Sequence, residues 1–280
     1  MKIFKTKKEL QDYLSAAREA KQKVALIPTM GALHEGHISL IEYAKPIADI
    51  RVCSIFVNPT QFNDPKDLEK YPRPIQHDIR MLESANCDIL FMPSTAEMYG
   101  TNEEWHIDLG DLDSIWEGEH RPGHFQGVTQ IVYKLFTLVQ PDIACFGQKD
   151  FQQVMVINKM IKDKHLPIQL AICPIVRDKD GLALSSRNAR LSEAGKKTAL
   201  ALSKALRYVR DQFTQTSPDQ LKEEAIAILE QTAGVKVEYF AICETTTLHE
   251  AHTIEADKKY VALVTAWVEG VRLIDNMILN

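Results

Sequence analysis

The chain has 280 residues, of which 45% are apolar and 25% are charged, a balance typical of a globular protein with a sizeable core. With 33 Lys and Arg against 38 Asp and Glu, the net charge is −5, which argues against nucleic-acid binding because such proteins carry a basic surplus. The five cysteines are scattered without a C-x-x-C pair, so we expect buried free thiols. No apolar stretch has the length of a signal peptide or a membrane span, and we therefore expect a cytoplasmic protein.

Strand-like and helix-like segments alternate over the first 176 residues. Short continuous apolar runs are typical of buried parallel strands, whereas longer runs with apolar residues on one side are typical of helices. In chain order, the pattern predicts a helix at 7–20, a strand at 23–28, a helix at 37–45, a strand at 50–59, a helix at 74–86, a strand at 87–94, a long helix at 125–141, a strand at 142–147, a helix at 150–164 and a strand at 168–176. This order predicts an α/β fold with a Rossmann-like, doubly wound parallel sheet in a domain of residues 1–176.

The pattern changes after residue 191. Helices are predicted at 192–213 and 219–234, and strands at 235–243 and 260–268. A run of helices followed by strands predicts a second, smaller α+β domain over residues 177–280.

Two histidines three residues apart follow the first long strand, in Met30-Gly-Ala-Leu-His-Glu-Gly-His37. A helix that begins here directs backbone N–H groups and its positive dipole end toward an anion, and the glycines permit close approach of a phosphate. Imidazoles at this spacing share a helix face, so both can donate to one phosphate. A zinc protease helix needs a spacing of four, and the other alternative is a helix start with incidental histidines. We favour phosphate binding.

Two neutral amides, Asn58 and Gln61, follow the next strand in Phe56-Val-Asn-Pro-Thr-Gln-Phe62. Parallel strands end at one edge of the sheet, so these amides should line the same crevice as the histidines. An amide both donates and accepts, which suits a substrate with hydroxyl groups and a carboxylate. A simple proline-containing turn is the alternative.

Lys149 and Asp150 lie between a predicted strand and helix, in the segment 146–157. Lys149 offers a mobile positive charge, and Asp150 is a candidate N-cap. Gln153 follows Lys149 by four residues, which on a helix places both side chains on one face. A capped helix with solvated polar groups is the alternative.

Ser185, Ser186 and Arg187 lie within residues 177–188, at the predicted domain boundary. Two hydroxyls and a guanidinium suit the oxygens of a triphosphate. A hairpin followed by a plain loop is equally natural for this segment.

Three further polar residues have no role that the sequence defines. Arg121 and His124 precede the long helix as part of a cap, a lid or a site, and Asp78 either meets a metal ion or an amine or is solvated. The chain lacks the G-x-x-x-x-G-K-[ST], G-x-G-x-x-G and G-x-S-x-G motifs, so kinase-like, dehydrogenase-like and serine-hydrolase sites lose support.

Taken together, the blocks PTMGALHEGH, FVNPTQF, YPR, RPGHFQGV, FGQKDFQQ and LSSRN resemble the pantothenate synthetase (pantoate–β-alanine ligase) family, in order from about residue 23 to 191. H-x-G-H alone is typical of the wider nucleotidyltransferase superfamily. The family joins (R)-pantoate to β-alanine through an enzyme-bound pantoyl adenylate and releases AMP and diphosphate, a step toward coenzyme A. The resemblance implies the same C–N bond-forming activity here, with ATP as co-substrate, with Mg²⁺, and in a homodimer.

The resemblance also implies a role for each matching residue. It places ATP against Met30, Gly31, Ala32, Leu33, His34, Glu35, Gly36 and His37, against Gly147, Gln148, Lys149 and Asp150, against Val176 at the adenine, and against a KMSKS-type loop of Leu184, Ser185, Ser186 and Arg187. The implied catalytic residues, which stabilise charge on the phosphates, are His37, His34, Lys149 and Arg187. Asn58, Gln61 and Gln153 would hold pantoate, with Gln61 also near β-alanine. The resemblance does not identify the ligands of Mg²⁺.

Two other classes of protein remain as alternatives. Another nucleotidyltransferase, acting on a phosphate-bearing substrate, should carry more Arg and Lys than the segment 56–62 does. A non-catalytic nucleotide-binding protein would not need the two histidines, the lysine and the arginine together.

Overall fold

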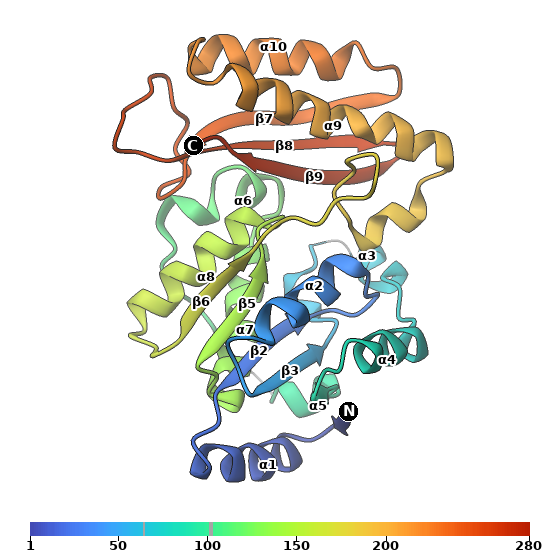
Figure 1. The fold of residues 1–280 in the computed structure, drawn as a ribbon, viewed down its shortest axis with the longest axis vertical. Helices are drawn as coiled ribbons and strands as arrows, with labels where there is room; N and C mark the ends of the chain where they lie inside the picture. Colours follow the sequence, from blue (N-terminus) through green and yellow to red (C-terminus); the bar gives the residue numbers. More distant parts are fainter. Residues whose placement is uncertain (64, 101–102) are drawn as a thin grey trace. The chain divides into compact units, whose positions relative to one another are not determined.

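The computed structural model describes residues 1–63, 65–100 and 103–280, which form two compact units (Figure 1). Unit 1 comprises Met1–Gly147 and Gln152–Pro174, and unit 2 comprises Gln148–Phe151 and Ile175–Asn280. The short segment Gln148–Phe151 therefore packs with residues that follow it by more than a hundred positions.

Within the described residues, unit 1 contains a six-stranded parallel sheet with the order β1-β4-β3-β2-β5-β6. Its strands are β1 (Lys2–Phe4), β2 (Val24–Thr29), β3 (Ile50–Ile55), β4 (Ile89–Phe91), β5 (Ile143–Gly147) and β6 (Gln169–Cys173). From β2 the chain adds strands in one direction and from β5 in the other, so the topological switch point lies between these two strands. Ligands of doubly wound sheets bind at such a point, beyond the carboxyl ends of the strands.

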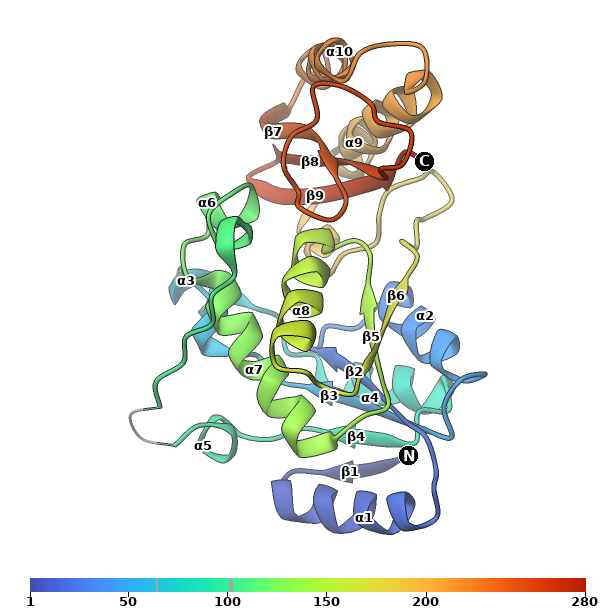
Figure 2. The ribbon, with the colours of Figure 1, turned by 90° about the vertical axis from the view of Figure 1, so that its left-hand side faces the viewer.

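Helices cover both faces of this sheet, with α2 and α4 on one face and α7 and α8 on the other (Figure 2). The helices of this part of the chain are α1 (Lys7–Glu19), α2 (Glu35–Ala44), α3 (Pro65–Lys70), α4 (Ile75–Ser84), α5 (Thr95–Met98), α6 (Glu117–His120), α7 (His124–Val139) and α8 (Phe151–Asp163), with 3-10 turns η1 (Pro59–Gln61) and η2 (Gly110–Asp113). The central strands are buried on both sides, which is why β2 reads as a continuous apolar run.

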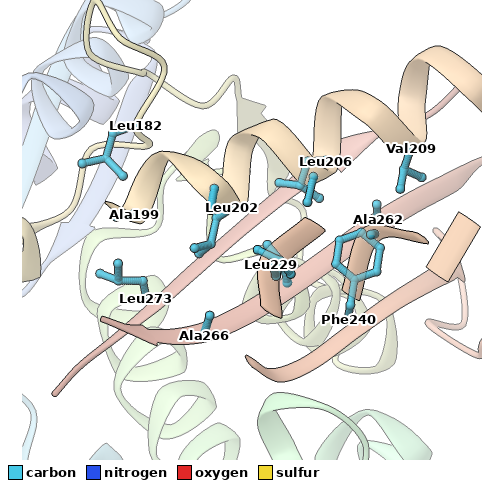
Figure 3. Close-up of a cluster of buried hydrophobic side chains, with 14 of the residues drawn as sticks. Leu182, Ala199, Leu202, Leu206, Val209, Leu229, Phe240, Ala262, Ala266 and Leu273 are labelled. Carbon is cyan, nitrogen blue, oxygen red and sulfur yellow. The ribbon is translucent and has the colours of Figure 1, made fainter. Parts of the chain in front are cut away.

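In unit 2, an antiparallel sheet of β7 (Val235–Glu244), β8 (Tyr260–Val268) and β9 (Val271–Ile278) is covered by α9 (Glu193–Gln212) and α10 (Pro218–Glu230). Leu202 and Leu206 of α9 point toward Phe240 and Leu273 of the sheet in one buried cluster (Figure 3). The turn between β8 and β9 is the two-residue kind that suits a twisted hairpin, because both of its residues adopt a positive φ.

The predicted fold class is confirmed by this architecture. The predicted strands at 50–59 and 168–176 end earlier, at Ile55 and at Cys173, and the second ends directly before Pro174, which has no N–H for a ladder. The short edge strand β1 and the whole of β9 were not predicted from the pattern. None of the described helices combines the length and apolar character needed to cross a membrane.

All five cysteines are free and buried, as expected from their apolar surroundings. Burial raises the pKa of the Cys53 thiol well above its usual range and that of Cys87 to about 11. Because the thiolate is the reactive form, both burial and a raised pKa protect a thiol from reagents.

We predict that the native protein reacts with Ellman's reagent only as it unfolds. The exposed position Ser15 on α1 supplies a matched control, since Ser15→Cys introduces one thiol that is open to solvent. The variant should release one equivalent of chromophore rapidly at neutral pH while the parent protein releases none in the same period. A fast equivalent from the parent would contradict the burial of its thiols.

Candidate active site

The loop between β2 and α2 is held by a carboxylate from α4. Asp78, fully buried, accepts the backbone N–H of Ala32 at 2.9 Å on one oxygen and that of Leu33 at 2.8 Å on the other. The loop passes so close to α4 that a Cβ at Gly31 would lie 3.0 Å from the Asp78 carboxylate, and Gly31 also has a φ of +81°. Both Asp78 oxygens thus bind the protein's own backbone, which favours a structural role over contact with a metal ion or an amine.

The side chains of His34 and His37 are each held by a backbone N–H at the start of α2. His34 is the N-cap, and its Nδ1 accepts the Gly36 N–H at 3.1 Å, while the Nδ1 of His37 accepts the His34 N–H at 3.3 Å. The imidazole rings lie 4.1 Å apart between centroids. Since each Nδ1 accepts a hydrogen bond, the proton of each neutral ring is on Nε2. The arrangement provides two imidazole donors beside the positive end of a helix dipole, which suits an anion.

The side chain of Asn58 is the centre of a buried amide network after β3. Its Nδ2 donates to the carbonyl of Gly127 at 3.0 Å and to Oε1 of Gln61 at 3.2 Å. Its Oδ1 accepts the Tyr99 hydroxyl at 2.6 Å, and burial raises the pKa of Tyr99, which keeps this hydroxyl a donor. Asn58 is 1% exposed and its hydrogen-bonding groups are already used inside the protein.

Gln61 is the member of this network whose side-chain amide can turn to a ligand. Its Nε2 donates to the sulfur of Met30 at 3.1 Å, and a thioether is a weak acceptor that a ligand oxygen can replace. This contact brings together the loops that follow β2 and β3, as the sequence predicted for neighbouring parallel strands.

The backbone of Gln61 is positioned by His124, the first residue of α7. The Gln61 carbonyl can only accept, so the His124 Nδ1 at 2.8 Å must carry the proton. An Arg121 guanidinium nitrogen, which can only donate, lies 3.1 Å from the other ring nitrogen, so that nitrogen accepts. Arg121 and His124 therefore act together on the turn that carries Gln61.

Gly127 lets this turn pack against α7. A Cβ at Gly127 would lie 2.3 Å from the carbonyl oxygen of Thr60 and 2.6 Å from the backbone nitrogen of Gln61, distances that no real side chain shows. The glycine of the RPGHFQGV block is therefore required by close approach of two backbones rather than by an unusual φ.

The residues predicted after β5 divide between the two units. Gly147 ends β5 in unit 1, whereas Gln148, Lys149 and Asp150 pack with unit 2. Because α8 begins at Phe151, Lys149 precedes the helix and the expected helical spacing between Lys149 and Gln153 does not apply. Among the described residues, no carboxylate forms an ion pair with the Lys149 ammonium.

A hairpin in unit 2 carries the remaining predicted residues. The Leu184 N–H donates to the Val176 carbonyl at 3.0 Å, and the Oδ1 of Asp178 caps the turn by accepting three backbone N–H groups, those of residues 180, 181 and 182. Ser185 then caps a 3-10 helix, η3 (Ser186–Arg190), by accepting the Arg187 N–H at 3.2 Å. The hairpin expected for the first part of this segment is present, with Arg177 paired to Ala183, whereas the part expected as a plain loop forms the 3-10 helix η3.

A cavity of about 360 Å³ lies elsewhere on unit 1, lined by residues of α1, α5 and α7 and by Trp105. None of the predicted site residues lines it. The described residues contain no group of three or more His, Cys, Asp or Glu side chains arranged to hold a metal ion.

Sequence reasoning missed the contributions of Tyr99, Gly127 and Asn276. Gly127 had a signal, a glycine inside an otherwise apolar helix pattern, which usually marks a close approach. Tyr99 and Asn276 had none, because each acts on a residue far away in the chain.

The fold and these loops define a doubly wound α/β protein, and the helix start at the sheet's carboxyl edge has a geometry that suits an anion. The chain matches the model of the pantoate-beta-alanine ligase family over residues 2–278. It is 46% identical to the pantothenate synthetase of Cytophaga hutchinsonii over 274 residues, covering 97% of this chain and 96% of the relative. It is 42% identical to that of Thermotoga petrophila over the full length of both.

Two solved structures give the same result. Pantothenate synthetase from Thermus thermophilus superimposes with a TM-score of 0.93 at 37% identity, covering 100% of this chain and 99% of the other. The pantoate-β-alanine ligase of Francisella tularensis, complexed with beta-gamma ATP and β-alanine, has a TM-score of 0.82 at 34% identity and covers 100% and 98%. The chain belongs to the pantoate-β-alanine ligase family, whose members form a C–N bond.

We predict that Asp78→Asn lowers the free energy of unfolding by about 1–3 kcal/mol, because an amide has only one oxygen and leaves a backbone N–H of the loop facing another donor. Glu83→Gln, an exposed change of the same chemistry on α4, is the control and should have little effect. Urea unfolding of both variants measures the difference. Equal midpoints would mean that the two hydrogen bonds do not hold the loop.

We also predict that Gly127→Ala is destabilising by about 1–3 kcal/mol, because the new methyl group forces the turn at Thr60 away from α7. Gly147→Ala is the matched control for stability, since a Cβ there meets no atom within 4 Å. Thermal unfolding compares the two alanine variants. Equal melting temperatures would mean that close packing at Gly127 does not contribute to stability.

Proposed function

We propose that the chain catalyses the ATP-dependent condensation of (R)-pantoate with β-alanine to pantothenate, with release of AMP and diphosphate. Its family membership over nearly the whole chain and the Francisella tularensis relative complexed with beta-gamma ATP and β-alanine support this activity. The observation that carries it is the pair of histidines fixed by their own backbone at the start of α2, beside the Asn58–Gln61 turn.

The reaction needs two displacements. A pantoate carboxylate oxygen attacks the α-phosphorus of ATP, the bond to the bridging oxygen breaks, and diphosphate leaves. The unprotonated β-alanine nitrogen then attacks the carbonyl carbon of the enzyme-bound pantoyl adenylate, the bond from that carbon to the AMP oxygen breaks, AMP leaves, and the nitrogen loses a proton to solvent or a phosphate oxygen. No covalent protein nucleophile is required, so positioning and charge stabilisation carry the catalysis.

We assign the phosphates of ATP to the loop from Met30 to His37. Donation from the Nε2–H of His34 and His37 stabilises charge that develops as diphosphate leaves, and preorganised donors are most effective because they need no rearrangement. Asp78 supports this by fixing the loop before the histidines.

Pantoate is assigned to the neighbouring amides. Gln61 exchanges its weak bond to Met30 for a pantoate oxygen and also lies near β-alanine, while Gln153 is a further donor. Asn58 is assigned to pantoate as well, and its hydrogen bond to Oε1 of Gln61 also orients that side chain.

Unit 2 supplies the remaining nucleotide contacts in this proposal. Lys149 and Arg187 neutralise phosphate charge, with Gln148 and Asp150 beside them and Ser185 and Ser186 in the same loop as the arginine. Val176 contacts the adenine, and Leu184, whose N–H donates to the Val176 carbonyl, belongs to the loop of Ser185, Ser186 and Arg187 that closes over the triphosphate. Gly147 allows the nucleotide to approach the end of β5.

Mg²⁺ is proposed to enter with ATP. Since the described residues offer no carboxylate cluster and both Asp78 oxygens are engaged, the ion would be held by phosphates and water, as Mg²⁺ commonly is at nucleotide sites. When bound, it neutralises the charge of the phosphate oxygens.

Three further expectations belong to the same proposal: a cytoplasmic location, a homodimer, and a division into domains of residues 1–176 and 177–280 with the second acting as a lid. The substrates are small molecules, with no nucleic acid involved. These expectations stay predictions.

We predict that purified protein given ATP, Mg²⁺, pantoate and β-alanine forms pantothenate and AMP, and that His37→Ala lowers kcat by about 10²–10³-fold, the effect of losing one preorganised donor. His106→Ala, an exposed change of the same chemistry, is the control. Mass spectrometry follows both products.

Omission of β-alanine should leave pantoyl adenylate on the enzyme and no pantothenate. If the wild-type protein does not adenylate pantoate, the proposed function is wrong. If His37→Ala retains the parental rate, the chemistry holds but the role assigned to the histidine does not.

A further inference from the structure

The geometry points to Asn276 of β9 as a positioning residue for Lys149. This inference rests on the proposed function, because it concerns how the chain sets its phosphate-binding lysine. Neither residue type nor position singled out Asn276 in the sequence, where β9 itself was not predicted.

The three hydrogen bonds of the Asn276 side-chain amide all go to two consecutive residues. Its Nδ2 donates to the carbonyls of Gln148 and Lys149, each at 2.9 Å, and its Oδ1 accepts the Gln148 side-chain amide at 3.1 Å. Asn276 is 2% exposed, so these bonds lie in a low-dielectric setting where leaving the carbonyls unpaired is costly.

The Asn276 amide gives the carbonyls of Gln148 and Lys149 the hydrogen bonds that a strand or helix gives elsewhere. Lys149 follows β5 and precedes α8, so neither a sheet ladder nor a helix accounts for the Gln148 and Lys149 carbonyls. A backbone held at both carbonyls leaves only the lysine side chain to be ordered when phosphate binds. Fixing a group before binding reduces the entropy lost in the complex.

The preceding residue of β9 anchors the other nucleotide segment of unit 2. Both oxygens of Asp275 accept from Arg177, at 2.6 and 2.9 Å, and Arg177 also donates to the Asn276 carbonyl at 3.3 Å. Arg177 follows Val176 at the start of the hairpin and reaches the Gly181 carbonyl at 3.2 Å. One dipeptide of β9 thus holds both the Lys149 segment and the 176–187 hairpin.

A residue that positions Lys149 affects only the step in which Lys149 acts, whereas a residue that stabilises the whole protein affects both half-reactions. Lys149 acts on the charge that develops on diphosphate as it leaves during adenylation, whereas in the attack of β-alanine the leaving group is AMP and no diphosphate is involved. Loss of Asn276 should therefore slow the first half-reaction and leave the second unchanged.

The test compares Asn276→Asp with Asn280→Asp. Aspartate at 276 removes the donor and directs a charge at two carbonyl oxygens. Asn280 lies four residues further on and makes similar bonds, to the Tyr260 N–H at 2.8 Å and the Lys258 carbonyl at 2.9 Å, but touches no proposed site segment. Pantoate-dependent exchange of labelled diphosphate into ATP measures the first half-reaction, and single-turnover transfer from preformed pantoyl adenylate to β-alanine measures the second.

We expect Asn276→Asp to slow exchange by about tenfold to a hundredfold, the scale of a misplaced catalytic group. Transfer to β-alanine should stay at the wild-type rate, and Asn280→Asp should match wild type in both steps. Combined with Lys149→Ala, Asn276→Asp should reduce exchange no further than Lys149→Ala alone, because residues that act as a unit are not additive. If the aspartate variant does not fold, Asn276→Ala, which adds no charge, takes its place.

Normal exchange in a folded Asn276 variant would overturn the inference, as would an equal loss in both half-reactions or full additivity with Lys149→Ala. An inactive wild-type protein would instead refute the proposed function.

Discussion

The candidate site depends first on one buried carboxylate. Asp78 holds the backbone of Ala32 and Leu33, and the path of that backbone decides where His34 begins α2. The loop adopts a positive φ at Gly31 and again at Ala32, and such conformations are unfavourable for a residue with a Cβ. Two short hydrogen bonds in a buried setting are what make this path the stable one.

A buried side chain that hydrogen-bonds the backbone next to a candidate site residue occurs at three places. Asp78 fixes the N–H groups before the histidines, His124 fixes the carbonyl of Gln61, and Asn276 fixes the carbonyls around Lys149. Each target lies just beyond the end of a strand, where the ladder no longer satisfies the backbone. Buried backbone groups need partners, so the side chains that supply them also decide where the neighbouring functional groups lie.

Periodicity was enough to predict the α/β fold, the order of most elements and the loops that carry polar residues. Buried strands such as β2 are apolar throughout, and a histidine pair or an amide pair at a strand end is visible as a motif. The three side chains that hold these backbone groups cannot be recognised in the sequence, because each lies far along the chain from the group it bonds, at separations of 46, 63 and 127 residues. Local pattern contains no information about which distant residue satisfies a given backbone group.

The strand β9 and the contacts of Asn276 escaped prediction from the sequence for related reasons. The sequence of β9, VRLIDNMI, begins with the alternation of a half-buried strand, but Asp275 and Asn276 are both buried and break the pattern. Two polar residues are tolerated in a buried strand only when their hydrogen bonds are satisfied, and here the partners are Arg177 and the Gln148–Lys149 backbone. The departure from strand periodicity in β9 therefore follows from the contacts that order the Gln148–Lys149 backbone and the hairpin that begins at Arg177.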